Sequence, residues 1–245
     1  MAVLFLVRRG LSGFALKCIA AAGMLADHLY VFFPDRFPEW LHPATRFVAP
    51  VFAFLIVEGY YHTSNRVKYG LRLWLGAAGM FLLRILLELT AGVTIHNNIF
   101  YTLALGYTAV CCVARGKDAR DSGRWYLFAL ALVLLGALTA EGGMSVLPFM
   151  LLCVLFREKK GAWAVACIGW GCLLFGAEYL AAQVQGQNVW DTLLWRSDFL
   201  FPMALPLLWC YNGRRGCAKS AAKWGFYGFY PAHIAILAIA SAIGI

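Results

Sequence analysis

The stretch Lys17-Cys-Ile-Ala-Ala-Ala-Gly-Met-Leu-Ala-Asp27-His28 places a histidine, directly after an aspartate, deep inside an apolar run. Ionisable side chains are costly in hydrocarbon, and those that occur there usually face a protein interior or a water-filled cavity. Lys17 and His28 are close to three helical turns apart, so both fall on one helix face, roughly 16 Å from each other along the axis. This spacing predicts a functional helix rather than a simple membrane span.

The composition of the whole chain places this stretch in a membrane. Hydrophobic residues make up 62% of the 245 positions, charged residues make up 13%, and the mean hydropathy is +0.71. A soluble domain does not reach these values. We therefore expect an all-α integral membrane protein, a single polytopic bundle of about nine transmembrane helices, with a range of about eight to ten. The expected spans are 14–33, 44–61, 71–90, 97–114, 125–139, 144–156, 162–181, 193–211 and 224–243.

Three of these spans are irregular. The runs 125–139 and 144–156 are short, so each is expected to be tilted or re-entrant, or the two form one helical hairpin. Pro202 and Pro206 lie inside the run 193–211. They predict a kink or a break there, which either exposes backbone groups to a cavity or is packed by neighbouring helices.

Basic residues alternate between the connections. Of the 21 lysines and arginines, 17 lie before or at the start of the first run or in every second connection. By the positive-inside rule these segments face the cytoplasm, so the N-terminus is expected inside and the C-terminus outside. This alternation explains the net charge of +9 without a nucleic-acid partner. Residues 1–26 resemble a signal peptide, but cleavage beside Asp27 would destroy the alternation, and we expect the segment to be retained.

The spans contain few ionisable groups that could carry chemistry. His28 and His233 are expected at a similar depth, with Arg84 near the same level. Neutral imidazole accepts a proton well near neutral pH, and a neighbouring carboxylate such as Asp27 can stabilise the imidazolium that forms. Each group also has a structural interpretation, and Arg84 with Glu88 most simply forms a neutralising pair one turn apart. The scattered histidines show no metal-ligand spacing, and the eight cysteines form no CxxC pair.

A second group of polar residues lies at the expected cytoplasmic ends. Glu58, His62 and Arg66 recur at helical spacing, which is typical either of helix capping or of a functional rim. Together with Lys17, the basic residues Arg66, Lys68 and Arg72 are expected to form a cytoplasmic mouth. Such a mouth would attract a ligand that carries several phosphates.

The sequence resembles two groups of known proteins. Lys17, ten residues and His28 are similar to the Arg-x10-His signature of type 3 membrane acyltransferases, with lysine in place of arginine, over about residues 15–85. The closer resemblance, over about residues 15–240, is to the TraX family, which is named for a conjugation protein that acetylates pilin. The shared motifs are Asp27-His28, Phe52-x-Phe-x-x-x-Glu-Gly-Tyr-x-His62-Thr63, Tyr69-x-x-Arg72-Leu73, Asn97-Asn98-Ile-Phe-x-Thr-Leu, Glu141-Gly-Gly and Lys223-Trp-x-Phe-Tyr-x-Phe-Tyr-Pro-x-His233.

The resemblance implies an acetyltransferase in the plasma (inner) membrane of a bacterium. Acetyl coenzyme A would enter from the cytoplasm, bound by Lys17, Glu58, His62, Arg66, Lys68 and Arg72. His28 would act as the base or form an acetyl-imidazole intermediate, with Asp27 beside it. Arg84 or Asn98 would stabilise the oxyanion, and His233 would align the acceptor. The acceptor is an amine or hydroxyl arriving from the outer side, on a small or flexible molecule such as a peptide N-terminus, a glycan or a metabolite.

Two other functions fit the same polar residues. Buried Asp, His, Glu and Arg side chains also build proton relays in transporters of small solutes. A non-catalytic subunit of an envelope assembly machine is the third interpretation, and it predicts that the polar cluster tolerates substitution. Thermal protection by coenzyme A would separate an enzyme from a transporter.

Overall fold

The computed structural model describes residues 10–96, 98–217 and 220–244, without the side chains of residues 220–223. In this part of the chain the regular structure is helical, apart from one isolated bridge between Leu11 and Tyr211. The helices are α2 (Gly13–Phe32), η1 (Pro34–Arg36), α3 (Leu41–Ala44), α4 (Val48–His62), α5 (Arg66–Ala91), α6 (Ile99–Asp118), α7 (Ser122–Thr139), α8 (Gly143–Leu155), α9 (Lys160–Val184), α10 (Val189–Trp195), η2 (Ser197–Met203), α11 (Ala204–Trp209) and α12 (Ser220–Ala242).

Seven helical segments of the described chain are long and apolar enough to cross a membrane. The surfaces of these helices are apolar as well. On α5, Leu75, Leu82 and Leu89 lie seven residues apart along one stripe and are 61%, 68% and 81% exposed. Such a stripe is unfavourable in water and favourable against lipid tails. The molecule is therefore a multi-pass membrane protein.

Two shorter apolar helical segments complete the bundle, Gly143–Leu155 and Ser197–Trp209. All nine expected spans coincide with helical segments, and the run 125–139 belongs to an 18-residue helix that is long enough to cross. The run 193–211 is not one continuous helix. It is divided into α10, η2 and α11, and Pro202 lies inside η2, where it cannot donate an α-helical hydrogen bond.

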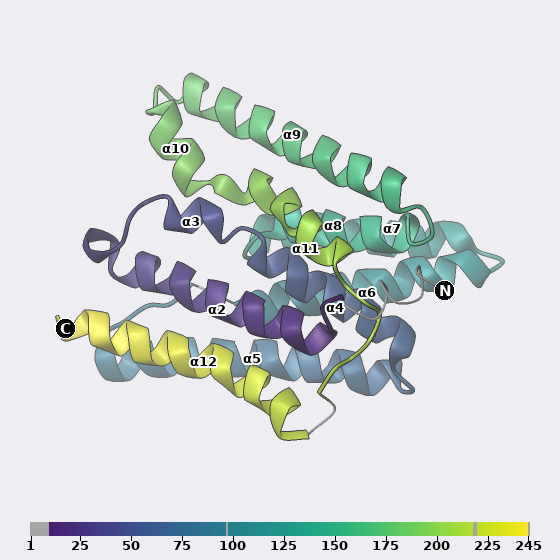
Figure 1. Cartoon of the computed structure of the whole chain (residues 1–245), viewed down its shortest axis with the longest axis horizontal. Coiled ribbons are helices and arrows are strands. Elements are labelled where there is room, and N and C mark those ends of the chain that lie inside the picture. Colours follow the sequence, from purple (N-terminus) through teal and green to yellow (C-terminus); the bar gives the residue numbers. More distant parts are fainter. Residues whose placement is uncertain (1–9, 97, 218–219, 245) are drawn as a thin grey trace.

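Helix α6 lies at the centre of the bundle. It is the most buried of the seven long helices, and it packs against α4, α5, α7 and α8. Small residues allow the close approach of α7 to α8, because a Cβ atom on Gly143 would overlap the backbone of Gly136. Helix α2 packs between α4 and α12, which brings the first and last described helices side by side (Figure 1).

The long helices run along one common axis, so the bundle has two ends (Figure 1). The basic-loop end contains the connections 63–65, 119–121, 156–159 and 210–217. Hydrogen bonds join the last of these connections to α2, since the carbonyls of Arg214 and Arg215 accept from the amides of Gly13 and Phe14 at the start of that helix. The opposite end contains the connections 33–47, 92–96, 140–142 and 185–188. The alternation of charge along the sequence thus corresponds to two physical ends of the molecule.

Candidate functional site

The two histidines expected at a similar depth form a direct pair. His28 of α2 and His233 of α12 are 4% and 6% exposed, and their rings are stacked with centroids 4.9 Å apart. The Nδ1 atom of His28 lies 2.7 Å from the Nε2 atom of His233. The pair forms because α2 and α12 pack against each other along their lengths.

Hydrogen bonding fixes the tautomers of this pair. The Nδ1–H of His233 donates to the carbonyl oxygen of Phe229, one turn earlier on α12, at 2.7 Å. A carbonyl only accepts, so in the neutral ring Nε2 of His233 carries the lone pair. The bond between the rings is then donated by Nδ1–H of His28. The remaining nitrogen, Nε2 of His28, is left unprotonated, with its lone pair free.

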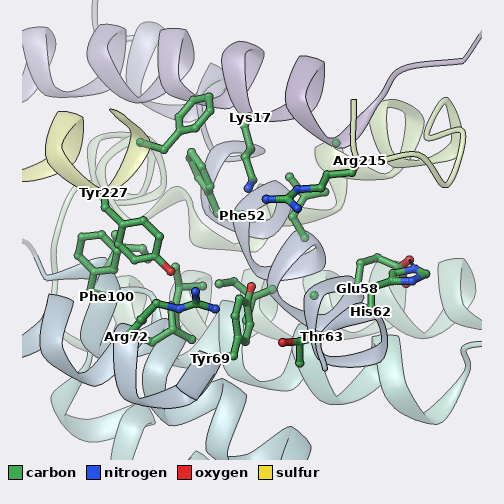
Figure 2. A pocket seen from close by; sticks show the side chains of 18 of the residues that line it. Lys17, Phe52, Glu58, His62, Thr63, Tyr69, Arg72, Phe100, Arg215 and Tyr227 are labelled. Carbon is green, nitrogen blue, oxygen red and sulfur yellow. Dashed lines mark ion pairs between the residues drawn. The ribbon is translucent and has the colours of Figure 1, made fainter. Parts of the chain in front are cut away.

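A cavity of about 660 Å³ opens at the basic-loop end and extends into the bundle between α2, α4, α5, α6 and α12. Figure 2 shows Lys17 and Arg215 pointing toward each other on one side of this cavity, with Arg72 on α5 across from them. Within the described part of the chain, none of these three cations has an ion-pair partner. The cavity therefore offers positive charge to a ligand.

Two of the three cations contact aromatic rings instead of carboxylates. The guanidinium of Arg72 lies 5.3 Å from the ring centroid of Tyr69, and its Nε is buried without a hydrogen-bond partner. The ammonium of Lys17 lies 5.8 Å from the ring centroid of Phe226. Cation–π contacts orient a cation without neutralising it, so both side chains keep the capacity to bind an anion.

The carboxylate in the lining of this cavity is already neutralised. Glu58 Oε1 accepts from Nη1 of Arg157 at 2.6 Å, and Glu58 Oε2 lies 3.5 Å from Nε2 of His62. Arg157 belongs to the basic connection 156–159. Glu58 thus anchors this connection against the end of α4 and does not cancel the charge of the free cations.

The inner end of the cavity stops one layer of side chains short of the imidazole pair. Met24 lines the cavity and precedes His28 by one turn of α2. Tyr230 also lines the cavity, and its ring centroid is 6.2 Å from that of His28 and 5.8 Å from that of His233. His28 itself does not line the cavity. Met24 and Tyr230 therefore separate the cavity from the pair.

The basic mouth differs from the one expected from sequence. Lys17, Glu58, His62 and Arg72 line the cavity. Arg66 does not line this cavity. Its guanidinium stacks on Tyr60, 4.4 Å from the ring centroid, and the residue lines a separate hollow. Lys68 is exposed in the first turn of α5 and lies outside the lining as well. Arg215 lines the cavity instead of Arg66 and Lys68. The only sequence signal for this role is its location in a basic connection.

Asp27 belongs to a different cluster, near the opposite end of the bundle. Its Oδ1 accepts hydrogen bonds from Nδ1 of His42 at 2.8 Å, Oγ1 of Thr45 at 2.7 Å and Nη2 of Arg46 at 2.7 Å. Arg46 also reaches Asp198 at 3.2 Å. The carboxylate is thus engaged by α3 and by the residues between α3 and α4, and within the described residues it makes no hydrogen bond with His28.

Sequence reasoning missed the partners of Asp27. They lie in the segment 34–46, which follows the first expected span. His42 and Arg46, one helical turn apart in that segment, are the signal that could have indicated a carboxylate partner. The ring nitrogens of His42 face two acceptors, Asp27 and the carbonyl oxygen of Trp195 at 3.1 Å. His42 therefore joins α2 to α10 through its two ring nitrogens.

Asn98 and Arg84 are not placed at the cavity. Asn98 caps α6, because its Oδ1 accepts from the amide of Tyr101 at 3.2 Å while its Nδ2 donates to the carbonyl of Ala77 at 3.2 Å. Both ends of the amide are therefore used structurally. Arg84 is half-buried on α5, outside the cavity lining, and the described residues show no ion pair between Arg84 and Glu88.

Comparison with known proteins agrees with the motifs. The family model described as TraX protein matches residues 12–241, so the chain belongs to the TraX family. A curated relative is the "Probable fimbrial assembly protein FimC, serogroup H1" of Dichelobacter nodosus. It is 28% identical over 241 residues, covering 92% of this chain and 94% of that protein. No solved structure matches.

Proposed function

We propose that this TraX-family chain is a membrane-embedded acetyltransferase. It would take acetyl groups from cytoplasmic acetyl coenzyme A and pass them to an amine or hydroxyl acceptor at the outer side of the membrane. The observation that carries the proposal is a cavity bearing three unpaired cations that lies beside a buried imidazole pair, in which Nε2 of His28 keeps a free lone pair. The positive-inside rule supports an orientation in which the basic-loop end faces the cytoplasm, and the cavity would then open toward the compartment that contains the coenzyme.

Binding of the coenzyme would begin with its phosphates. Lys17, Arg72 and Arg215 surround the cavity and have no carboxylate partners. Phosphate oxygens would accept hydrogen bonds from the unused donors of Arg72, whose buried Nε has no hydrogen-bond partner. The narrow pantetheine arm would then follow α2 inward from Lys17 toward Met24, which carries the thioester along the helix face that also bears His28.

The last step of entry requires a rearrangement. Met24 and Tyr230 stand between the cavity and the imidazole pair. Met24 is an unbranched side chain that changes rotamer easily. Tyr230 is more firmly held, since its hydroxyl oxygen accepts from the amide of Ile99 at 3.1 Å. We infer that Met24 moves aside and that Tyr230 stays as a wall of the reaction space.

In the reaction itself, Nε2 of His28 would remove a proton from the acceptor as its nitrogen or oxygen attacks the thioester carbonyl carbon. The new C–N or C–O bond forms, the C–S bond breaks, and the thiolate of coenzyme A takes the proton back from His28. His233 would keep His28 in the correct tautomer by accepting from Nδ1–H. In the variant mechanism, Nε2 attacks first and carries the acetyl group.

The developing oxyanion needs a donor, and the structure offers Tyr230 rather than Asn98. The side chain of Asn98 is used in capping α6, whereas Tyr230 lines the cavity and contacts both imidazoles. Its oxygen already accepts from Ile99, which leaves the O–H proton to donate toward a reacting carbonyl.

A second candidate function is a non-catalytic subunit of a fimbrial assembly machine. The name of the Dichelobacter nodosus relative favours it. In that case the three cations would serve packing or membrane contacts, and coenzyme A would have no specific site. A proton-coupled transporter would likewise show no coenzyme dependence.

Thermal unfolding of the purified protein in detergent, with and without coenzyme A, tests the proposal. A ligand present at a hundred times its Kd stabilises the folded state by about 2.7 kcal/mol. We expect a clear rise in Tm with coenzyme A and a smaller rise with its form lacking the 3′-phosphate. The Lys17→Gln/Arg215→Gln variant should lose most of the rise. An unchanged Tm in the wild-type protein would favour the assembly subunit or the transporter.

A further inference from the structure

Three of the sequence motifs are joined by hydrogen bonds, and the proposed reaction gives one of them, Glu141-Gly-Gly, no role. Glu141 belongs to the connection 140–142 between α7 and α8. The motif that contains Asn98 and Ile99 lies at the start of α6, and the motif of α12 contains Tyr230. Glu141 contacts the second motif, and the second motif contacts the third.

The carboxylate of Glu141 holds the beginning of α6. Its Oε2 atom accepts a hydrogen bond from the backbone amide of Asn98 at 2.7 Å. A hydrogen bond to an ionised acceptor is roughly twice as strong as one between neutral groups. The negative charge also lies at the N-terminus of a 20-residue helix, which is the end that favours an anion. Glu141 is therefore a strong anchor for the first turn of α6.

The backbone around Glu141 is fixed as well. Gly142 has a φ of 62°, in the left-handed region that glycine adopts without strain, and Gly143 lies tightly against the backbone of Gly136 on α7. The carbonyl oxygen of Glu141 accepts from Oγ1 of the fully buried Thr102 at 2.7 Å. Glu141 is thus bound to α6 through both its backbone and its side chain, and the connection and the helix start form one rigid unit.

The amide next to this anchor holds Tyr230. Ile99 follows Asn98 directly, and its N–H donates to the hydroxyl oxygen of Tyr230 at 3.1 Å. The first amides of a helix have no partner within the helix, so an acceptor from elsewhere in the molecule is needed, and Tyr230 supplies it. Tyr230 is only 3% exposed. Since its hydroxyl is the proposed donor to the oxyanion, the start of α6 determines where that donor lies.

We propose, on the basis of the proposed acetyltransferase function, that Glu141 is a positioning residue that acts on the reaction through Tyr230. Glu141 does not line the cavity. An oxyanion donor is effective only when it lies about 3 Å from the oxygen that gains charge. Without the carboxylate, the amide of Asn98 loses its acceptor, the first turn of α6 loosens, and the hydroxyl of Tyr230 loses its fixed place.

Steady-state kinetics tests this role. Glu141→Leu removes the acceptor of the Asn98 amide, whereas Glu141→Gln keeps an acceptor oxygen. Both variants keep the bond from Thr102, which goes to the backbone. We expect Glu141→Leu to lower kcat roughly tenfold, the worth of a charge-assisted hydrogen bond, with the KM for acetyl coenzyme A unchanged. Glu141→Gln should restore most of kcat. Glu88→Leu, at an exposed carboxylate near the same end of the bundle, is the matched control.

A double-mutant cycle with Tyr230→Phe shows whether Glu141 acts through the hydroxyl group. In the Tyr230→Phe background, Glu141→Leu should change kcat by less than about twofold, because the group that Glu141 positions is already absent. The same tenfold loss in both backgrounds would overturn the proposal, and so would an unchanged kcat in Glu141→Leu alone. Glu141 is exposed, so its variants are expected to fold.

A measurement without turnover separates the role of Glu141 from the proposed function. Fluorotyrosine is placed at position 230, and its fluorine NMR resonance reports the hydrogen bonding of the phenol oxygen. We expect this resonance to move in Glu141→Leu and to stay in place in Glu141→Gln and Glu88→Leu. An inactive wild-type protein would reject the proposed function. An active wild-type protein whose resonance is unmoved by Glu141→Leu would reject only the role of Glu141.

Discussion

At the scale of single residues, the account depends on which nitrogen of His28 is free. The carbonyl of Phe229 fixes the proton of His233, and His233 in turn fixes that of His28. This is the orienting relationship that a base needs from its neighbour, since a ring held in the wrong tautomer presents N–H instead of a lone pair. His233 is therefore a positioning residue rather than an acceptor-binding one.

Substitution of His233 tests the orienting role. We expect His233→Leu to lower kcat by roughly 100-fold, because general-base catalysis contributes on that order, while the KM for acetyl coenzyme A stays unchanged. His233→Gln should restore part of kcat, since its amide oxygen can accept from Nδ1–H of His28. Steady-state kinetics separates the two constants. An equal loss of kcat in both variants would show that the hydrogen bond that His233 accepts from His28 does not contribute to catalysis.

The cations of the mouth should act on binding alone. Arg72→Gln is expected to raise the KM for acetyl coenzyme A by roughly tenfold or more, the worth of a lost charge-assisted hydrogen bond, with kcat little changed. Lys68→Gln is the matched control, since Lys68 lies on the same helix but outside the cavity. Similar KM values for the two variants would remove Arg72 from the coenzyme site.

Much of the candidate site could be predicted one residue at a time. Lys17, His28 and His233 were indicated by their depth and helical spacing, which depend only on the local period of a helix. Arg215, Tyr230 and His42 could not be assigned in this way, because their roles depend on which helices are neighbours. Sequence alone also could not show that Asn98 caps α6, since a cap and an oxyanion donor have the same residue type.

At the scale of elements, the Asp27 cluster ties three segments together. Asp27 belongs to α2, His42 and Arg46 flank the start of α4, and Asp198 belongs to η2. Because Asp27 precedes His28 directly, this cluster sets the rotation of α2 about its axis. The cluster thereby directs the imidazole of His28 toward α12, although it does not contact that ring.

Removal of the Asp27 carboxylate should destabilise the protein. Asp27→Asn leaves His42 and Arg46, both largely buried, without their shared anion, and we expect a loss of about 3 kcal/mol in the free energy of unfolding. Asp35→Asn, at an exposed acidic residue of η1, is the control. Denaturant unfolding in detergent measures both. A loss below about 0.5 kcal/mol for Asp27→Asn would show that the cluster does not hold α2.

Hydropathy predicted the elements well and their continuity less well. The expected spans coincide with helices because burial in lipid demands long apolar helical runs. The proline residues of the run 193–211 predicted an irregularity, but they could not show that η2 and α11 would form separate segments. That outcome depends on how α9 and α8 pack against η2.

At the scale of the whole molecule, orientation in the membrane decides the function. The proposal requires the basic-loop end to face the cytoplasm. Lys117→Cys places a thiol at that end, and Trp40→Cys, at a side chain 62% exposed, places one at the other. In intact cells, with native cysteines replaced, a membrane-impermeant maleimide should label only the second variant. Labelling of the Lys117→Cys variant alone would show that the basic-loop end faces the outside.

The most direct measurement of the central claim uses inverted membrane vesicles, which expose the cytoplasmic face to added reagents. Labelled acetyl coenzyme A is supplied outside, and transfer of the label into membrane components is followed by mass spectrometry. Vesicles with the wild-type protein should acquire acetyl groups, as should those with the control His96→Gln, whose histidine lies in an exposed connection away from the cavity. Vesicles with His28→Gln, at equal protein levels, should match those without the protein. Full labelling by His28→Gln would contradict the account.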